Sequence, residues 1–261
     1  TQSNHARQTA AAARKLGLEP HLVLRAPREE ARSGVQGNLL IDLLLGATVH
    51  WTDEPAPFAE TIRRVAAELA AAGGRPHVIP YGGSNAYGMM GYVLAMKEVA
   101  QQTAGMGLTF AAHVFASSSG GMHAGMILGA HLAYEHGVAP QLVGISIADP
   151  ASELKARLVE LVREGADLLG VDYRVSPADI TAYDSYLGGG YAVVGDLERE
   201  AIRLAARHEG LLLDPVYTGR AFGGLIDLVR RGVYGPDDRV LFWHSGGTAG
   251  LFAFAAELGV S

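Results

Sequence analysis

The sequence predicts an α/β protein in which parallel β-sheets are covered by helices on both faces. Hydrophobic residues make up 49% of the 261 residues, charged residues 18%, and 34 residues are glycine, a composition typical of a compact, enzyme-like chain. Short apolar segments alternate with amphipathic helical segments, which is the pattern of parallel strands joined by right-handed helical crossovers. Turns rich in Gly, Ser or Thr follow several of the expected strands, and open α/β sheets bind ligands at that edge.

Composition and charge exclude several classes of protein. The formal net charge is −6 and no basic stripe runs along the chain, which argues against nucleic-acid binding. The absence of cysteine excludes disulfides and thiolate metal sites, and we expect no metal site. Asp, Arg or His interrupts each apolar run before it reaches the length of a membrane span. We therefore expect a soluble, cytoplasmic protein without a membrane partner.

Residues 1–80 are predicted to form a smaller α/β domain. An alanine-rich helix is expected over residues 6–16, ended by Gly17 and capped by Ser3 or Asn4. Further helices are expected over residues 38–45 and 58–72, and strands over residues 21–24, 47–51 and 77–80.

Residues 81–261 are predicted to form a larger domain that binds the ligand. One strand is expected in the apolar run that begins at residue 108, and others over residues 141–147, 211–214 and 239–243. One helix is expected to follow the turn at residues 81–91 and to continue through residue 100. Further helices are expected from about residue 123 to 136 and over residues 151–164, 197–208 and 221–231. Residues 180–195 are rich in Gly and Tyr, and this stretch is interpreted as a loop of the kind found in active sites.

The stretch LTFAAHVFASSSGGMHAG, residues 108–125, predicts an anion site. An apolar run ends in small residues, Ala116 to Gly121, and a helix is expected to begin near His123. The first N–H groups of a helix lack internal partners and favour negative charge, and small residues let a phosphate approach the backbone. The stretch matches neither the Walker pattern nor Gly-x-Gly-x-x-Gly. An ordinary turn between a strand and a helix is the alternative interpretation.

Six segments together resemble the D-cysteine desulfhydrase and 1-aminocyclopropane-1-carboxylate deaminase family. They are TQSNHARQTAA (1–11), GGSNAYGMMGY (82–92), ASSSGGMHAG (116–125), GGGYAV (188–193), DPVYTGRA (214–221) and HSGGTAGLF (244–252), in the family's order. The resemblance implies pyridoxal 5′-phosphate (PLP) as cofactor. It also implies the fold of the tryptophan synthase β-subunit, PLP fold type II, with two open parallel-sheet domains, and a homodimer.

The resemblance assigns a role to each residue of the Ser-Asn-His motif at positions 3–5. Asn4 would bind the ring oxygen of the cofactor, and Ser3 would approach the substrate as a candidate catalytic residue. The N–H groups of the turn formed by Ser3, Asn4 and His5 would bind the substrate carboxylate.

The same resemblance places the cofactor phosphate at Ser118, Ser119, Gly120, Gly121 and Met122. The family usually has a threonine in place of Met122, and the threonine donates its hydroxyl. We therefore expect weaker phosphate binding here, carried by backbone N–H groups.

Two tyrosines and two hydroxyl residues complete the implied site. Tyr191 and Tyr217 match family tyrosines near the substrate and are candidate catalytic groups, although a packing role anchored by the hydroxyl is the alternative. Thr218 occupies the position where the deaminases carry a glutamate that faces the pyridine nitrogen, and Ser245 is a second candidate for contact with that nitrogen. A hydroxyl at 218 favours the desulfhydrase or sulfo-lyase branch over cyclopropane ring opening.

The chain lacks a match to the family segment Gly-Asn-Lys-x-Arg-Lys-Leu-Glu, which carries the Schiff-base lysine. Its three lysines, Lys15, Lys97 and Lys155, lie in segments where we expect solvent-exposed side chains. The sequence is thus expected to be a truncated or split portion of an enzyme, as its start at the Ser-Asn-His motif suggests, or else an inactive relative.

These observations lead to a hypothesis and its rivals. The hypothesis is a PLP-dependent lyase that converts D-cysteine to pyruvate, sulfide and ammonia, or L-cysteate to pyruvate, sulfite and ammonia. 1-Aminocyclopropane-1-carboxylate is the third candidate substrate. One rival is a non-catalytic protein that binds PLP or an amino acid. The other is a subunit whose partner chain supplies the lysine.

Overall fold

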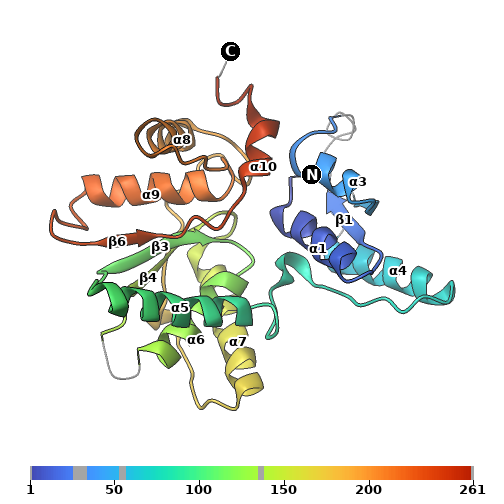
Figure 1. Ribbon diagram of the computed structural model, residues 1–261, viewed down its shortest axis with the longest axis horizontal. Coiled ribbons are helices and arrows are strands. Elements are labelled where there is room, and N and C mark those ends of the chain that lie inside the picture. The colour runs from blue at the N-terminus through green and yellow to red at the C-terminus, as the bar shows by residue number, and fades with distance from the viewer. Residues whose placement is uncertain (1, 26–33, 53–56, 135–137, 260–261) are drawn as a thin grey trace. The chain divides into compact units, whose positions relative to one another are not determined.

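The computed structural model describes residues 2–25, 34–52, 57–134 and 138–259 (Figure 1). The chain divides into two compact units: unit 1 comprises Thr1–Gly82 and Thr248–Ser261, and unit 2 comprises Gly83–Gly247. The predicted boundary at residue 80 lies next to Gly82. The prediction assigned residues 248–261 to the larger domain, and this assignment is corrected here. They group with unit 1 because α10 (Thr248–Leu251) packs on α3 (Gly37–Leu44).

Unit 1 is built around one parallel strand pair, β1 (His21–Arg25) with β2 (Thr48–Thr52). Its helices are α1 (Asn4–Lys15), α3, α4 (Phe58–Ala71) and α10, with the 3₁₀ turn η3 (Phe252–Phe254) at the end. Alternate residues of β1 point inward, so that Leu22 and Leu24 pack with Leu39 of α3 and Ala10 of α1. This core fixes the start of α1, where the Ser-Asn-His motif lies.

Unit 2 is built on a four-stranded parallel sheet in the order β5-β4-β3-β6. The strands are β3 (Ala112–Ser117), β4 (Gln141–Ser146), β5 (Thr181–Tyr183) and β6 (Val240–Phe242). The chain runs outward from β3 to β4 and β5, then returns to the other side of β3 with β6. The strand order therefore reverses between β3 and β6, which is where open α/β sheets form ligand sites beyond the carboxyl ends of the strands.

Helices cover both faces of this sheet, as predicted (Figure 1). One face carries α5 (Met90–Met106), α6 (Gly121–Ala133) and α7 (Ala151–Leu169), and the other carries α8 (Asp196–Glu209) and α9 (Thr218–Arg230). Val114 of β3 belongs to the core shared with α9, whereas its neighbour Phe115 packs with Met96 and Met126 of α5 and α6. The near-continuous burial of β3 follows from its position between two helical layers.

Three predicted elements differ from the structure. Residues 77–80 and 211–214 were predicted as strands, but within the described residues neither segment joins a β-ladder. Residues 77–79 are exposed, and 211–214 lead directly into a turn before α9. The predicted loop 180–195 begins with β5, because Thr181–Tyr183 pairs with Val143–Ile145 of β4. The predicted end of a helix at His136 lies outside the described residues.

No helix within the described ranges is long and apolar enough to span a membrane.

The helices α5 and α6 approach each other at glycines. A Cβ on Gly125 would overlap the carbonyl oxygen of Met89 and lie 2.8 Å from the Cβ of Tyr92. A Cβ on Gly129 would lie 2.8 Å from the Cβ of Met96 and 2.9 Å from the Cα of Val93. These glycines therefore let the two helix backbones approach closely and hold α6 in place after β3.

We expect the substitution Gly125→Ala to destabilise the protein by about 1–3 kcal/mol, since the added methyl group overpacks a backbone contact. Urea denaturation followed by circular dichroism measures this effect. The matched control is Gly105→Ala in α5, where a Cβ would meet nothing within 4 Å, and where alanine should gain up to about 1 kcal/mol of helix propensity. Equal midpoints for the two variants would contradict the close packing of α5 on α6.

Candidate active site

The loop between β3 and α6 presents backbone donors where the strand order reverses. Ser118 and Ser119 are half-buried, and Gly120 at the N-cap of α6 has φ of 99°, a conformation that favours glycine. The first turn of α6 contains no acidic residue. A helix N-terminus with hydroxyl groups beside it and no carboxylate in its first turn favours the binding of an anion.

Ser84, from the segment 82–92, bonds to this loop. Its Oγ accepts the N–H of Gly121 at 3.0 Å and donates to Ser119 Oγ at 2.7 Å. A Cβ on Gly121 would lie 2.8 Å from Ser84 Oγ, so the glycine is needed for this approach. Sequence reasoning singled out the segment 82–92 but assigned no role to Ser84. The structure shows that this N–H at the helix start already binds an oxygen.

The side chains of His123 and Arg157 hold the loop and the end of β3 through hydrogen bonds. Ser117 Oγ lies 3.1 Å from Nδ1 of His123, which is almost fully buried. Burial lowers the pKa of His123 to about 3, and the charge of Lys155 also lowers it, so this imidazole is neutral at pH 7. Arg157 donates to the carbonyl of Ser118 at 3.4 Å and pairs with Asp149 at 2.7 Å.

The turn that precedes α9 is organised by the buried carboxylate of Asp214. It accepts backbone N–H groups from Val216, Tyr217 and Thr218 at 2.8 to 3.0 Å, and the Thr218 hydroxyl at 2.8 Å. Since these groups lie at the start of α9, the carboxylate satisfies helix donors that would otherwise lack partners.

Thr218, a predicted cofactor residue, is fully buried and bonded within this turn. Its hydroxyl donates to Asp214 Oδ1 and accepts the backbone N–H of Asp214 at 3.0 Å. A contact between this hydroxyl and a pyridine nitrogen would therefore have to replace one of these two bonds.

Tyr191 and Tyr217 are brought together. Their hydroxyl oxygens lie 2.7 Å apart, and their rings meet edge to face with centroids 6.1 Å apart. Tyr191 precedes Ala192, the non-glycine residue with positive φ (61°) within the described ranges. Such strain is characteristic of functional loops. Two phenols in contact can share and pass a proton, because each hydroxyl both donates and accepts.

Ser245 is exposed in the turn that follows β6. Beside it, Nε2 of His244 lies 3.0 Å from the carbonyl of Leu212, and Nδ1 accepts the N–H of Gly246 at 3.2 Å. Gly247, with φ of 104°, packs against Asp214 so closely that a Cβ there would lie 2.5 Å from Oδ1. The turns after β6 and before α9 therefore support each other.

In unit 1, the motif at positions 3–5 forms the start of α1. Ser3 is the N-cap, and its Oγ accepts the N–H of Ala6 at 3.1 Å, which confirms the predicted cap. Asn4 Oδ1 accepts Nδ2 of Asn38 at 2.7 Å, and Nε2 of His5 lies 3.2 Å from Thr9 Oγ1. Burial lowers the pKa of His5.

Comparison with known proteins identifies the family to which this chain belongs. The family model described as pyridoxal-phosphate dependent enzyme matches residues 1–246. The chain belongs to this family.

Individual relatives agree with the family model. A D-cysteine desulfhydrase from Yersinia enterocolitica is 39% identical over 259 residues, which cover 98% of this chain and 77% of that protein. A D-cysteine desulfhydrase from Salmonella choleraesuis is 39% identical over 256 residues, covering 97% and 76%. A crystal structure described as an ACC deaminase homologue matches with a TM-score of 0.86 and 37% identity, covering 98% of this chain and 74% of that one. The predicted resemblance and fold are confirmed.

PLP is thus the cofactor of this enzyme, and the loop between β3 and α6 fits its phosphate. The loop offers N–H and hydroxyl groups, contains no carboxylate, and has glycine at the two positions closest to the helix start. At Met122 only the backbone N–H meets the requirement of an anion site, since its half-buried side chain packs against the core with Phe115 and Met126. A phosphate here would rest on backbone N–H groups and the hydroxyls of Ser118 and Ser119, while Ser84 holds the loop through its bonds to Ser119 and Gly121.

The three lysines lie on helices. Lys15, at the end of α1, and Lys97, on α5, are exposed, as expected. Lys155 on α7 is half-buried, and its charge acts on His123, so it is less exposed than predicted. In the described part of the chain, no group of three His, Asp or Glu side chains could hold a metal ion.

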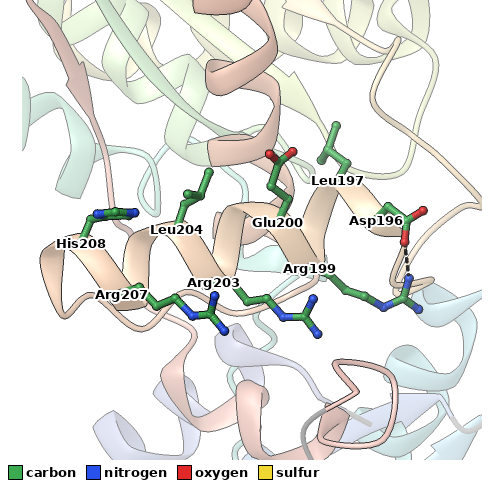
Figure 2. Close-up of a pocket in the computed structure, with 8 residues that line it drawn as sticks. All are labelled: Asp196, Leu197, Arg199, Glu200, Arg203, Leu204, Arg207 and His208. Carbon is green, nitrogen blue, oxygen red and sulfur yellow. Dashed lines mark hydrogen bonds and ion pairs between the residues drawn. The ribbon is translucent and has the colours of Figure 1, made fainter.

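A shallow hollow beside α8 is separate from these groups (Figure 2). It is lined by Asp196, Leu197, Arg199, Glu200, Arg203, Leu204, Arg207 and His208. All eight residues belong to one helix and none is a predicted site residue. Arg199 pairs with Asp196 at 2.9 Å, and the hollow is a solvated helix face without the backbone donors of the loop between β3 and α6.

The loop that carries Tyr191 is held by a buried ion pair. Arg220 of α9 is fully buried, and its Nε donates to Glu198 of α8 at 2.6 Å. Its other nitrogens donate to the carbonyls of Ile147 at 3.0 Å and Val193 at 2.9 Å. Glu198 also accepts the N–H of Gly195 at 2.8 Å. One guanidinium thus connects the end of β4, the tyrosine loop and two helices.

We expect Arg220→Met to destabilise the protein by about 3–5 kcal/mol, because it leaves the Glu198 carboxylate buried without its partner. The double variant Arg220→Met with Glu198→Met should recover most of this loss, since both charges are then removed. Urea denaturation measures both variants.

The control is Arg230→Met, which breaks a second ion pair between α8 and α9. Arg230 pairs with Glu200 at 2.6 Å, but both side chains are about half exposed, so water compensates for the loss. Its midpoint should stay close to that of the wild type, and a loss as large as that of Arg220→Met would refute the special role of the buried pair.

Proposed function

We propose that this PLP-dependent lyase removes the β-substituent of a small amino acid, with D-cysteine as its preferred substrate. The 39% identity to D-cysteine desulfhydrase over 98% of the chain carries the proposal. The reaction converts D-cysteine and water to pyruvate, hydrogen sulfide and ammonia. The Cβ–S bond breaks, the sulfur leaves with the electron pair, and water replaces the amino group.

In this proposal the cofactor phosphate binds to the loop residues Ser118, Ser119, Gly120, Gly121 and Met122. Asn4 donates to the ring oxygen, and Ser245, which is exposed after β6, is the first candidate for the pyridine nitrogen. Thr218 is the second candidate, although its bonds to Asp214 favour a role in shaping the turn.

When bound, PLP withdraws electrons from Cα of the amino acid and makes the α-proton acidic. The N–H groups at the start of α1, beside Ser3, Asn4 and His5, bind the substrate carboxylate. Ser3 Oγ accepts the N–H of Ala6 and keeps its own proton to donate toward the substrate.

The tyrosine pair supplies a proton to the departing sulfur. A single phenol is a weak acid near pH 7, but the contact between the Tyr191 and Tyr217 hydroxyls lets one stabilise the other as it gives up a proton. The pair therefore suits protonation of a leaving thiolate.

Ring opening of 1-aminocyclopropane-1-carboxylate is a second candidate, supported by the 37% identical structure described as an ACC deaminase homologue. Thr218 argues against it, because a buried neutral hydroxyl cannot favour a protonated pyridine nitrogen as a carboxylate does. L-Cysteate remains a candidate within the same elimination chemistry, with sulfite as the leaving group.

Binding of reduced cofactor–amino acid conjugates tests the substrate. These stable amines need no lysine, so binding reports on the site alone. We expect phosphopyridoxyl-D-cysteine to bind at least about tenfold more tightly than its L-isomer, a difference of ~1.4 kcal/mol, and more tightly than the conjugates of L-cysteate and 1-aminocyclopropane-1-carboxylate. Isothermal titration measures the four affinities, and sulfide and pyruvate release from D-cysteine measures turnover. Tightest binding of another conjugate would replace D-cysteine with that substrate.

Borohydride reduction of the PLP-treated protein, followed by peptide mass mapping, tests whether any lysine of this chain forms a Schiff base with PLP. We expect no pyridoxyl group on Lys15, Lys97 or Lys155, because the first two are exposed on helices and the third lies half-buried on α7, outside the loop between β3 and α6. The lysine that the family requires then comes from outside these 261 residues. A specific adduct on any of the three would overturn this assignment.

A further inference from the structure

Asn38 is a buried polar residue to which sequence reasoning assigned no role. It lies in α3, is completely buried, and belongs to unit 1 together with α1. Its backbone N–H donates to Oε1 of Gln2 at 2.8 Å, while its side chain bonds to Arg7 and Asn4. A buried amide with this many partners is fixed in one orientation.

The donor and the acceptor in each of these hydrogen bonds follow from the chemistry of the side chains. Arginine has only donors, so the Arg7 Nε that lies 3.4 Å from Asn38 requires the amide oxygen Oδ1 there. The amide nitrogen Nδ2 of Asn38 must then face Asn4, and it donates to Asn4 Oδ1 at 2.7 Å. With its oxygen held by Asn38, Asn4 can offer only its own Nδ2 group, a donor, to a ligand.

A buried carboxyl group and a glycine lie beside this network. Asp42, fully buried one turn after Asn38, is close enough to Arg7 that the arginine's charge lowers the pKa of its carboxyl, although burial has the larger effect and raises that pKa to about 6. Gly250 of α10 covers the amide pair, since a Cβ there would lie 3.6 Å from Asn38 Nδ2 and 3.9 Å from Asn4 Oδ1.

We propose that Asn38 is a positioning residue that sets the amide of Asn4 so that its nitrogen donates to the ring oxygen of PLP. The ring oxygen of bound PLP carries negative charge and needs a donor. An Asn4 amide in the opposite orientation would present its carbonyl oxygen and repel it. The inference rests on the proposed role of Asn4, which it explains: Arg7 sets Asn38, and Asn38 sets Asn4.

The test compares two ligands that differ at one atom group: PLP and 3-deoxypyridoxal 5′-phosphate, which lacks the ring hydroxyl. Isothermal titration of the full chain gives the ratio of the two affinities. The wild type should prefer PLP by about tenfold or more, as expected for a hydrogen bond to a charged acceptor. Asn4→Ala should reduce this ratio to about one, since it removes the donor.

Two substitutions at position 38 separate an effect on the orientation of the Asn4 amide from an effect on packing. In Asn38→Asp, the carboxylate can only accept, so it draws the Nδ2 group of Asn4 toward itself, and the PLP preference should fall to about one or below. In Asn38→Leu, Asn4 is free to turn, and most of the preference should remain. Thr61→Val is the matched control for the loss of a buried polar group in unit 1, because the Thr61 hydroxyl donates to Thr52 Oγ1 at 3.0 Å, away from the network of Asn38. It should leave the ratio unchanged.

The outcomes distinguish the inference from the proposed function. If the wild type prefers PLP and Asn4→Ala abolishes the preference, Asn4 has its proposed role. An unchanged ratio in Asn38→Asp, with both ligands weakened equally, would then show that Asn38 acts only on stability and overturn the inference. Equal affinities of the two ligands for the wild type would instead overturn the proposed role of Asn4 itself. Thermal unfolding of each variant identifies any loss of fold.

Discussion

The buried guanidinium of Arg220 is the constraint on which the active-site side of unit 2 depends. It bonds to one carboxylate and to two backbone carbonyls from segments far apart in the sequence. Burying a charge is costly, and the cost is offset only when partners surround it. Only a loop conformation that brings the carbonyl of Val193 to this position satisfies the guanidinium, which fixes where Tyr191 can lie. The strained backbone at Ala192 persists because this neighbouring contact holds it.

The proposed phosphate loop between β3 and α6 depends on packing in a different way. Its donors are mostly backbone groups, so their direction is set by where α6 lies relative to β3, and this in turn depends on the glycines that admit α5. In the proposed phosphate site, methionine at position 122 leaves the backbone donors in place, so the hydroxyl that the family's threonine would supply is one donor among several. It does not tolerate a side chain at Gly121, since Ser84 occupies that space.

Much of the fold and part of the site could be predicted from the sequence, because both depend on local patterns. Apolar periodicity located most helices, and the small residues after β3 indicated an anion site. The misplaced elements were short: residues 77–80 and 211–214 have strand-like composition, and β5 has only three paired residues. Strand formation requires a partner strand, and composition alone carries no information about the partner.

The sequence by itself determined the family, the cofactor and the helix caps, because motifs such as Ser3 to His5 act within a few residues. Only the tertiary structure decided which side chains act together. Ser84 meets Ser119 across 35 positions, Asn38 meets Asn4 across 34, and Arg220 meets Ile147 across 73. The physical reason is that a polar side chain finds its partner through burial, and burial is set by the packing of helices and strands that lie far apart in the chain.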